Sequence, residues 1–191
     1  HGAMSVSANE IKKIAFRPLL PDVRFLVHNE IAELSQITTR TAGVIIETVQ
    51  GDAGVRRPSA AFMQALRARC TEVGALLKFD EIQSGMGRTG TMFAFEQFGV
   101  VPDVLTLGKA LGGGMPIGAL VAAQQHLNLF THAPMLGHIT TFGGHPMVCA
   151  AAAATVQVLR TEIDWAQLEQ RAAAFAAQIA AHPAVKAHRR V

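Results

Sequence analysis

Short apolar runs alternate with longer helix-like segments through the middle of this 191-residue chain, and this alternation constrains the fold more than any other feature. It is typical of βα units, in which parallel strands are connected by helices that pack on the sheet. The sequence therefore predicts an α/β fold with a mainly parallel sheet. The runs that predict strands are Val23–Val27, Gly43–Ile46, Ala75–Phe79, Val104–Leu107 and Ile117–Ala122.

Three segments have the spacing and end signals of helices. The first begins after the cap Ser59, ends at Gly74 and has apolar residues at 3-4-3 spacing, namely Met63, Leu66, Cys70 and Val73. The second begins at Pro146, a residue suited to a first helical turn, and continues to Leu159. The third stops before His182 and carries on one face Trp165, Leu168, Ala172, Phe175 and Ile179.

Composition excludes several classes of protein. Half of the residues are hydrophobic and only 16% are charged, which excludes intrinsic disorder. The longest apolar stretch, near Ile117–Ala123, is far shorter than the roughly 20 residues of a membrane helix. Basic residues are scattered apart from His188–Arg190, so no nucleic-acid footprint is expected. Cys70 and Cys149 lie far apart, which indicates a reducing, cytoplasmic compartment and no disulfide or thiolate zinc site.

Polar residues follow three of the predicted strands directly. Glu47 follows the second strand, Asp80 and Glu81 follow the third, and Lys109 follows the fourth across a glycine. Because ligands of open parallel sheets bind outside the carboxyl ends of the strands, we expect a site there. Taken alone, each of these residues is equally well explained as an exposed charge in a loop. Three of them at three strand ends together favour a site.

A lysine and a carboxylate in one apolar crevice indicate a particular chemistry. A partly desolvated lysine amine has a lowered pKa and can form a Schiff base with a carbonyl. A carboxylate opposite it can keep a pyridinium nitrogen protonated, which makes the ring of pyridoxal phosphate an electron sink. A lysine and a carboxylate so placed favour pyridoxal 5'-phosphate as the cofactor.

Other ligand motifs fit less well. The segment Gly85–Gly90 matches the dinucleotide pattern G-x-G-x-x-G, but Thr91–Gly99 after it contains three Phe and is a poor phosphate-capping helix. Lys109 is not part of a nucleotide-binding P-loop, because no glycine stands five residues before Gly108. No metal site is expected, because no helical i, i+4 pairing occurs among His126, His132, His138 and His145.

Four motifs in order across the chain give a more specific match. They are Ile45–Val55, Phe79–Gly90, Thr106–Gly114 and Thr140–Pro146. In this order they resemble the class III aminotransferases, the ornithine, acetylornithine and 4-aminobutyrate group, which use pyridoxal phosphate. The resemblance implies the large domain of a fold type I enzyme, with three α/β/α layers. It also implies that residues 1–181 are part of that domain and that residues 182–191 enter a C-terminal small domain outside this chain.

The resemblance also implies roles for residues on the cofactor side. Lys109 would form the Schiff base and shuttle the proton between substrate and cofactor. Asp80 would bind the pyridine nitrogen, Ile82 would pack on a ring face, and Gln83 would reach the phenolic oxygen. Thr141 would bind the cofactor phosphate of a neighbouring subunit, which implies a homodimer with shared active sites.

Substrate-side positions depart from the common family pattern. Glu47 would lie near the substrate, in a motif that commonly reads Glu-Pro-Ile-Gln-Gly-Glu and here reads Glu-Thr-Val-Gln-Gly-Asp. Asp52 ends this motif where some members use a glutamate to hold a substrate-recognising arginine. His145 stands where an asparagine is usual. These departures bear on the substrate and leave the reaction class unchanged.

The function that follows from the resemblance is transfer of an amino group. An ornithine-like, acetylornithine-like or other ω-amino donor, or an α-amino donor, would pass it to a 2-oxo acid such as 2-oxoglutarate in a ping-pong reaction. Two alternatives stay open: a racemase or aminomutase of the same fold, and a truncated, non-catalytic fragment. Visible absorption of a bound cofactor would separate an enzyme from an empty scaffold.

Overall fold

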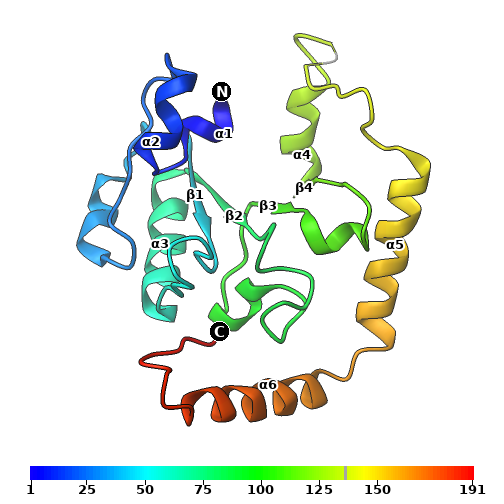
Figure 1. The fold of residues 1–191 in the computed structure, drawn as a ribbon. Helices are drawn as coiled ribbons and strands as arrows, with labels where there is room; N and C mark the ends of the chain where they lie inside the picture. Colours follow the sequence, from blue (N-terminus) through cyan, green and yellow to red (C-terminus); the bar gives the residue numbers. More distant parts are fainter. Residues whose placement is uncertain (136) are drawn as a thin grey trace.

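A four-stranded sheet forms the centre of the computed structural model, which describes residues 1–135 and 137–191 (Figure 1). The strands lie in the order β1 (Gly43–Glu47), β2 (Leu76–Asp80), β3 (Val104–Leu107) and β4 (Ala119–Ala122). Strands β1, β2 and β3 are parallel, and β4 runs antiparallel to β3. The predicted α/β fold with a mainly parallel sheet is therefore confirmed.

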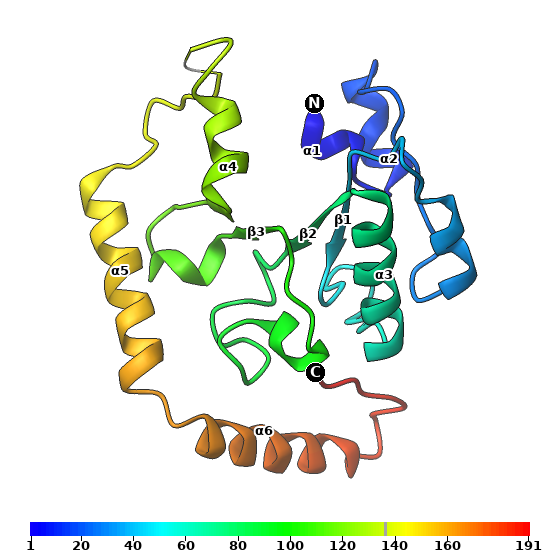
Figure 2. The same cartoon turned by 180° about the vertical axis from the view of Figure 1, so that it is seen from behind.

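One long helix lies against this sheet, and two others run at the periphery of the molecule. In both cartoon views α3 lies beside β1 and β2, whereas α5 and α6 run along the outer edge of the molecule (Figures 1 and 2). The α-helices are α1 (Gly2–Ser5), α2 (Glu10–Lys13), α3 (Ala60–Val73), α4 (Gln124–Leu127), α5 (Pro146–Thr161) and α6 (Trp165–Ala180). Short 3-10 helices are η1 (Ile14–Phe16), η2 (Ile31–Gln36), η3 (Ala94–Phe98), η4 (Lys109–Gly112) and η5 (Asn128–Phe130). None of the described helices is long and apolar enough to cross a membrane.

One predicted strand is wrong. Residues Val23–Val27 contain no strand, and the side chains of Phe25 and Val27 are 49% and 61% exposed. An extended segment becomes a strand only when its backbone pairs with a neighbour, and this segment joins no ladder of the described chain. The fifth predicted strand exists, but it begins two residues later than expected, at Ala119.

Helix α3 follows from its end signals and its apolar face. The Ser59 Oγ accepts the Phe62 backbone N–H at 3.1 Å, which caps the first turn, and Gly74 ends the helix in the left-handed region at φ +76°. The apolar face of the helix is almost completely buried against the sheet. These signals are local, which is why the sequence predicted both ends of α3.

The two faces of the sheet differ in burial. On the α3 side, Leu77 and Phe79 of β2 are fully buried in the main hydrophobic core. On the opposite face, Ile45 and Leu120 are 38% and 42% exposed, and Lys78 is half-buried in a central strand. Within the described residues, therefore, one face of the sheet is packed and the other is only partly covered.

Candidate active site

The carboxyl ends of the parallel strands bring the predicted polar residues to one edge of the sheet. Glu47 and Asp80 are the last residues of β1 and β2 and are direct partners in the ladder, so they lie on the same face. Lys109 follows β3 after Gly108 and begins η4. Strand β1 leads into the turn that contains Asp52, whose side chain is exposed.

Gln83 connects Lys109 with the turn after β1. The Lys109 Nζ donates a hydrogen bond to the Gln83 Oε1 at 3.3 Å. A Cβ at position 51 would come within 2.5 Å of the Gln83 Nε2, so the Gln83 amide packs directly over Gly51. A side chain at Gly51 would displace the amide from Lys109.

Asp80 and Ile82 complete the group around Lys109. The Asp80 Oδ1 accepts the backbone N–H of Ile82 at 3.0 Å, which fixes the carboxylate against its own turn. The Ile82 side chain is 37% exposed and lies 3.3 Å from the position that a Cβ on Gly108 would take. An apolar surface therefore lies beside the lysine, next to a carboxylate and an amide.

The backbone of Lys109 is strained. Its φ is +43°, a conformation that is unfavourable for a residue with a Cβ and costs about 1 to 3 kcal/mol. The turn is held by the Leu111 N–H, which donates to the Gly108 carbonyl at 2.9 Å, and by packing of Leu111 in the core. The Lys109 side chain is exposed, so the described residues do not form the closed apolar crevice that the sequence suggested.

Burial and neighbouring acids change the proton affinity of Glu47. Burial raises the pKa of Glu47 above its ordinary value, and the nearby charges of Asp80 and Asp52 raise it further. The Gly51 N–H and the Lys109 charge oppose this rise in pKa. Glu47 is therefore close enough to Asp80, Asp52 and Lys109 to interact with each of them electrostatically.

Glu81 does not belong to this group, although the sequence placed it with Asp80. It is fully buried, and its two oxygens accept the backbone N–H groups of Ala94 at 2.9 Å and Phe95 at 2.7 Å. Successive residues of an extended chain point to opposite faces, so Asp80 reaches the site and Glu81 reaches the interior. The same alternation could have separated the two acids at the sequence level.

A buried pair of hydroxyls near the site was not predicted from the sequence. The Oγ1 of Thr48 and the Oγ of Ser84 lie 2.7 Å apart, and both residues are buried. Thr48 stands at the position where the family motif commonly has a proline, which has no hydroxyl. Because the two residues are 36 positions apart, no local pattern indicates this contact.

Thr141 does not lie with the residues around Lys109. It is exposed in the loop between η5 and α5, and this part of the chain runs along the periphery, away from the sheet (Figure 1). His145 directly precedes α5, which begins at Pro146 as expected. The structure does not bring Thr141 to Lys109 within one chain.

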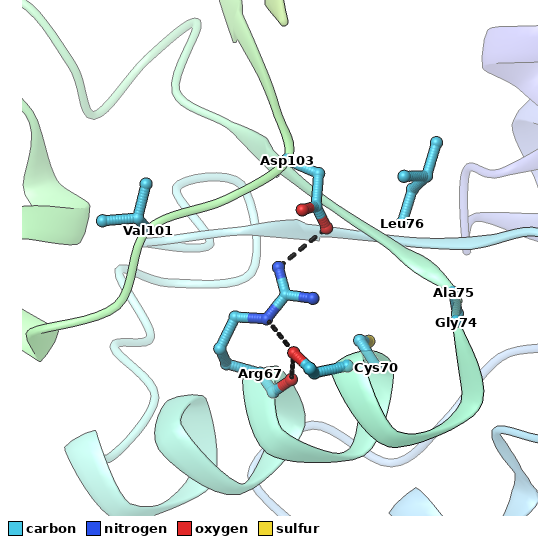
Figure 3. Close-up of a pocket in the computed structure, with 8 residues that line it drawn as sticks. Arg67, Cys70, Gly74, Ala75, Leu76, Val101 and Asp103 are labelled. Carbon is cyan, nitrogen blue, oxygen red and sulfur yellow. Dashed lines mark hydrogen bonds and ion pairs between the residues drawn. The ribbon is translucent and has the colours of Figure 1, made fainter. Parts of the chain in front are cut away.

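We also considered three other places where a ligand could bind: a surface pocket, the dinucleotide-like segment and a metal-binding cluster. Figure 3 shows a pocket at the opposite, amino end of β2 and β3, where Arg67 Nη1 and Asp103 Oδ2 form an ion pair at 2.7 Å. That Asp103 oxygen also accepts the Leu77 N–H, so these charges already stabilise the fold. In the dinucleotide-like segment, the Trp165 ring lies 3.1 Å from the position that a Cβ on Gly87 would take, so it packs against that glycine. The described residues contain no cluster of metal-binding side chains.

Comparisons with known proteins define the class of this chain. A sequence model of the class III aminotransferases matches residues 1–185. Putrescine aminotransferase from Pectobacterium atrosepticum is 46% identical over 169 residues, which are 84% of this chain and 36% of that protein. The chain therefore belongs to the class III aminotransferases, and it spans about a third of the length of this curated relative.

Solved structures agree with the fold. Ornithine aminotransferase from Toxoplasma gondii, whose structure has partial occupancy of PLP at its active site, gives a TM-score of 0.83 at 30% identity. The match covers 98% of this chain and 45% of that one. N-acetylornithine aminotransferase from Stenotrophomonas maltophilia gives a TM-score of 0.69 at 35% identity, over 82% of this chain and 41% of that one. The chain has the α/β fold of these fold type I enzymes.

Proposed function

We propose that this chain is the central part of a longer aminotransferase that uses pyridoxal 5'-phosphate, residues 1–181 within its large domain and residues 182–191 at the entry to a small domain. The observation that carries the proposal is the contact of Lys109 Nζ with Gln83 Oε1, at the strand edge that also holds Asp80. The incomplete coverage of the relatives supports the proposal that further segments complete the enzyme.

The residues at the carboxyl ends of the parallel strands fit this cofactor. They combine a primary amine, a carboxylate, an amide and an exposed apolar side chain, which suit its carbonyl, ring nitrogen, phenolic oxygen and ring face. We assign these contacts to Lys109, Asp80, Gln83 and Ile82 in that order. When bound, the cofactor supplies an electron sink for the bonds at the substrate carbon. Lys109 would hold the cofactor covalently in the absence of substrate and, as a free amine, would move the proton at that carbon, while the charge of Asp80 would keep the ring nitrogen protonated.

For the substrates, we propose an ω-amino donor, such as ornithine or putrescine, and a 2-oxo acid acceptor such as 2-oxoglutarate. The 46% identity to a putrescine aminotransferase supports a donor with a terminal amine. Glu47 and Asp52 are acidic residues close enough to interact electrostatically, and two acids suit a cationic donor. Asp52 is one methylene shorter than the glutamate of some members, so we expect it to contribute to donor choice.

We further propose a homodimer in the cytoplasm, with Thr141 of each subunit completing the site of the other. The loop before α5 is exposed, and its Phe142 is 79% exposed, which suits burial against a neighbour. Both cysteines are free, Cys70 buried and Cys149 exposed. Free cysteines are usual in a reducing compartment.

Cofactor attachment in the longer protein tests the function. We expect borohydride reduction followed by peptide mapping to place the cofactor on Lys109, and Lys109→Ala to abolish the label. Lys78, half-buried in the neighbouring strand β2, is the internal control. A label on any other lysine would contradict the assignment. If the label is found but amino transfer from ornithine and putrescine is absent, the racemase or aminomutase alternative is favoured.

A further inference from the structure

The interior beside the strand edge contains a buried acid that binds no substrate or cofactor atom in the proposed function. Glu81 follows Asp80 directly, is fully buried, and accepts two backbone N–H groups from the start of η3. A buried carboxylate is costly unless its oxygens are satisfied by hydrogen bonds. The presence of an acid at this buried position therefore has to be explained by its contacts.

Those contacts use both oxygens of the Glu81 carboxyl group. Ala94 and Phe95 each present a donor, one to each oxygen of Glu81, so the side chain must offer two acceptors. Glutamine is similar in size but has one oxygen and an NH2 group, which would face an N–H donor. Aspartate has both oxygens on a side chain that is one methylene shorter.

The contacts of Glu81 close a loop that carries site residues. Its backbone carbonyl accepts the Gly85 N–H at 3.0 Å, and a Cβ on Gly85 would come within 2.8 Å of that carbonyl oxygen. Its carboxylate holds the far end of the same loop at Ala94 and Phe95. Ile82 and Gln83 lie between Glu81 and Gly85, inside the turn that this backbone hydrogen bond closes, and Asp80 immediately precedes Glu81.

A second buried contact fixes the loop to the neighbouring strand. The hydroxyl pair Thr48–Ser84 joins the residue after Glu47 to the residue after Gln83 at 2.7 Å. The turns after β1 and β2 are therefore connected beneath the exposed side chains that face Lys109.

We propose that Glu81, together with the Thr48–Ser84 pair, is a positioning device that holds Asp80 and Gln83 in place for the cofactor on Lys109. This inference rests on the proposed function. Glu81 is a positioning residue, because it acts on the site only through the backbone of the turn after β2.

The test compares Glu81→Gln with Glu96→Gln in the longer protein. Glu96 is the matched control, because its Oε1 accepts the Phe93 N–H at 2.8 Å at the same η3 turn but is exposed. Glutamine keeps the one acceptor needed at position 96 and loses one of two at position 81. Three quantities are measured: the dissociation constant of pyridoxal phosphate, the pH midpoint of its visible absorption, and hydrogen exchange across residues 82–98.

We expect Glu81→Gln to raise the cofactor dissociation constant about tenfold or more, because a buried donor is left without an acceptor and the turn shifts. We also expect it to shift the absorption midpoint, because in the proposed function Asp80 and Gln83 would contact the ring nitrogen and the phenolic oxygen, and to speed hydrogen exchange in the loop. Glu96→Gln should leave the midpoint unchanged. An unchanged dissociation constant and midpoint in Glu81→Gln would overturn the proposal, even if the variant is less stable to heat.

If Glu81→Gln does not fold, the same measurements on Ser84→Ala test the proposal. This substitution removes only one hydroxyl of the Thr48–Ser84 pair. A shifted midpoint supports the device, and wild-type values in Ser84→Ala overturn it. Failure of the proposed function is distinguishable: in that case wild-type protein itself takes up no cofactor on Lys109.

Discussion

Two consecutive acids, Asp80 and Glu81, have opposite surroundings because of a single geometric rule. In an extended chain their side chains point to opposite faces, so one lies among the charges at the strand edge and the other among backbone donors in the core. Both residues carry the same functional group. Because of their positions, Asp80 is accessible to a ligand, whereas Glu81 can only form hydrogen bonds within the protein.

At the residue scale, Asp80→Asn is the sharpest test of the charge opposite Lys109. The substitution preserves size and removes the negative charge, so we expect the cofactor to remain bound. Amino transfer should fall by at least about 10²–10³-fold, the usual loss when one preorganised charge contact is removed. Steady-state rates with cofactor content measured in parallel check this. Activity within tenfold of wild type would show that Asp80 is not the partner of the ring.

The raised pKa of Glu47 predicts a pH dependence of stability. Because the pKa of Glu47 in the folded state exceeds its ordinary value of 4.5, the folded state binds this proton more tightly than the unfolded state does. The corresponding stabilisation is present below pH 4.5 and is lost as the pH rises through the higher folded value. Glu47→Gln lacks this titration. We therefore expect its free energy of unfolding, relative to that of wild type, to increase as the pH rises from below 4.5 to neutral.

Urea unfolding of both proteins below pH 4.5 and at neutral pH measures this difference. The comparison between variant and wild type removes the contributions of the acids that do not interact with Glu47, which both proteins share. A constant difference at the two pH values would show that burial beside Asp80 does not perturb Glu47.

At the element scale, α3 shows how local signals place a helix against the sheet. Ser59 begins it, Gly74 ends it, and the buried face between them packs on Leu77 and Phe79. The helix separates β1 from β2 along the chain and so allows the two strands to pair in parallel. Its position therefore determines that Glu47 and Asp80 end at the same edge.

We expect Ser59→Ala to lower the free energy of unfolding by about 1 kcal/mol, because the Phe62 N–H loses its cap. Ser35→Ala is the control: its hydroxyl is exposed and donates to the Ala32 carbonyl, so the change should stay within about 0.5 kcal/mol. Denaturant unfolding of the two variants checks this. Equal effects would mean that the Ser59 cap contributes nothing specific.

At the scale of the whole molecule, the chain exposes much more surface than a compact protein of its mass. Its accessible surface is 12760 Å², against about 8,800 Å² for a folded monomer of 20.3 kDa. The excess includes apolar side chains such as Ile11 and Phe175, 83% and 65% exposed, and the half-covered face of the sheet. Parallel sheets are normally covered on both faces. These surfaces suit contact with the rest of a longer chain and with a second subunit.

A mixed dimer tests the shared site. One subunit carries Lys109→Ala and the other Thr141→Ala. If Thr141 serves the neighbouring site, one site of the mixed dimer has both substitutions and the other has neither. We expect the activity of about one wild-type site to return, measured on dimers purified with two different tags. Mixed dimers without activity, or an active monomer, would contradict shared sites.

The sequence by itself determined the elements with local causes. Alternating apolar runs, the Ser59 cap, Gly74 and Pro146 predicted strands and helices to within a few residues, because these signals act between neighbours in the chain. The polar residues at the strand ends predicted the edge where Glu47, Asp80 and Lys109 meet, because parallel strands end together. The four motifs indicated the family.

Only the tertiary structure decided which segments found partners. Val23–Val27 has an apolar pattern but no neighbouring strand, so it stays outside the sheet. Glu81 with η3, Thr48 with Ser84, and Gln83 over Gly51 are contacts between residues far apart in sequence. Pairing and burial of this kind depend on how the whole chain packs, and a local pattern carries no information about a partner that is tens of residues away.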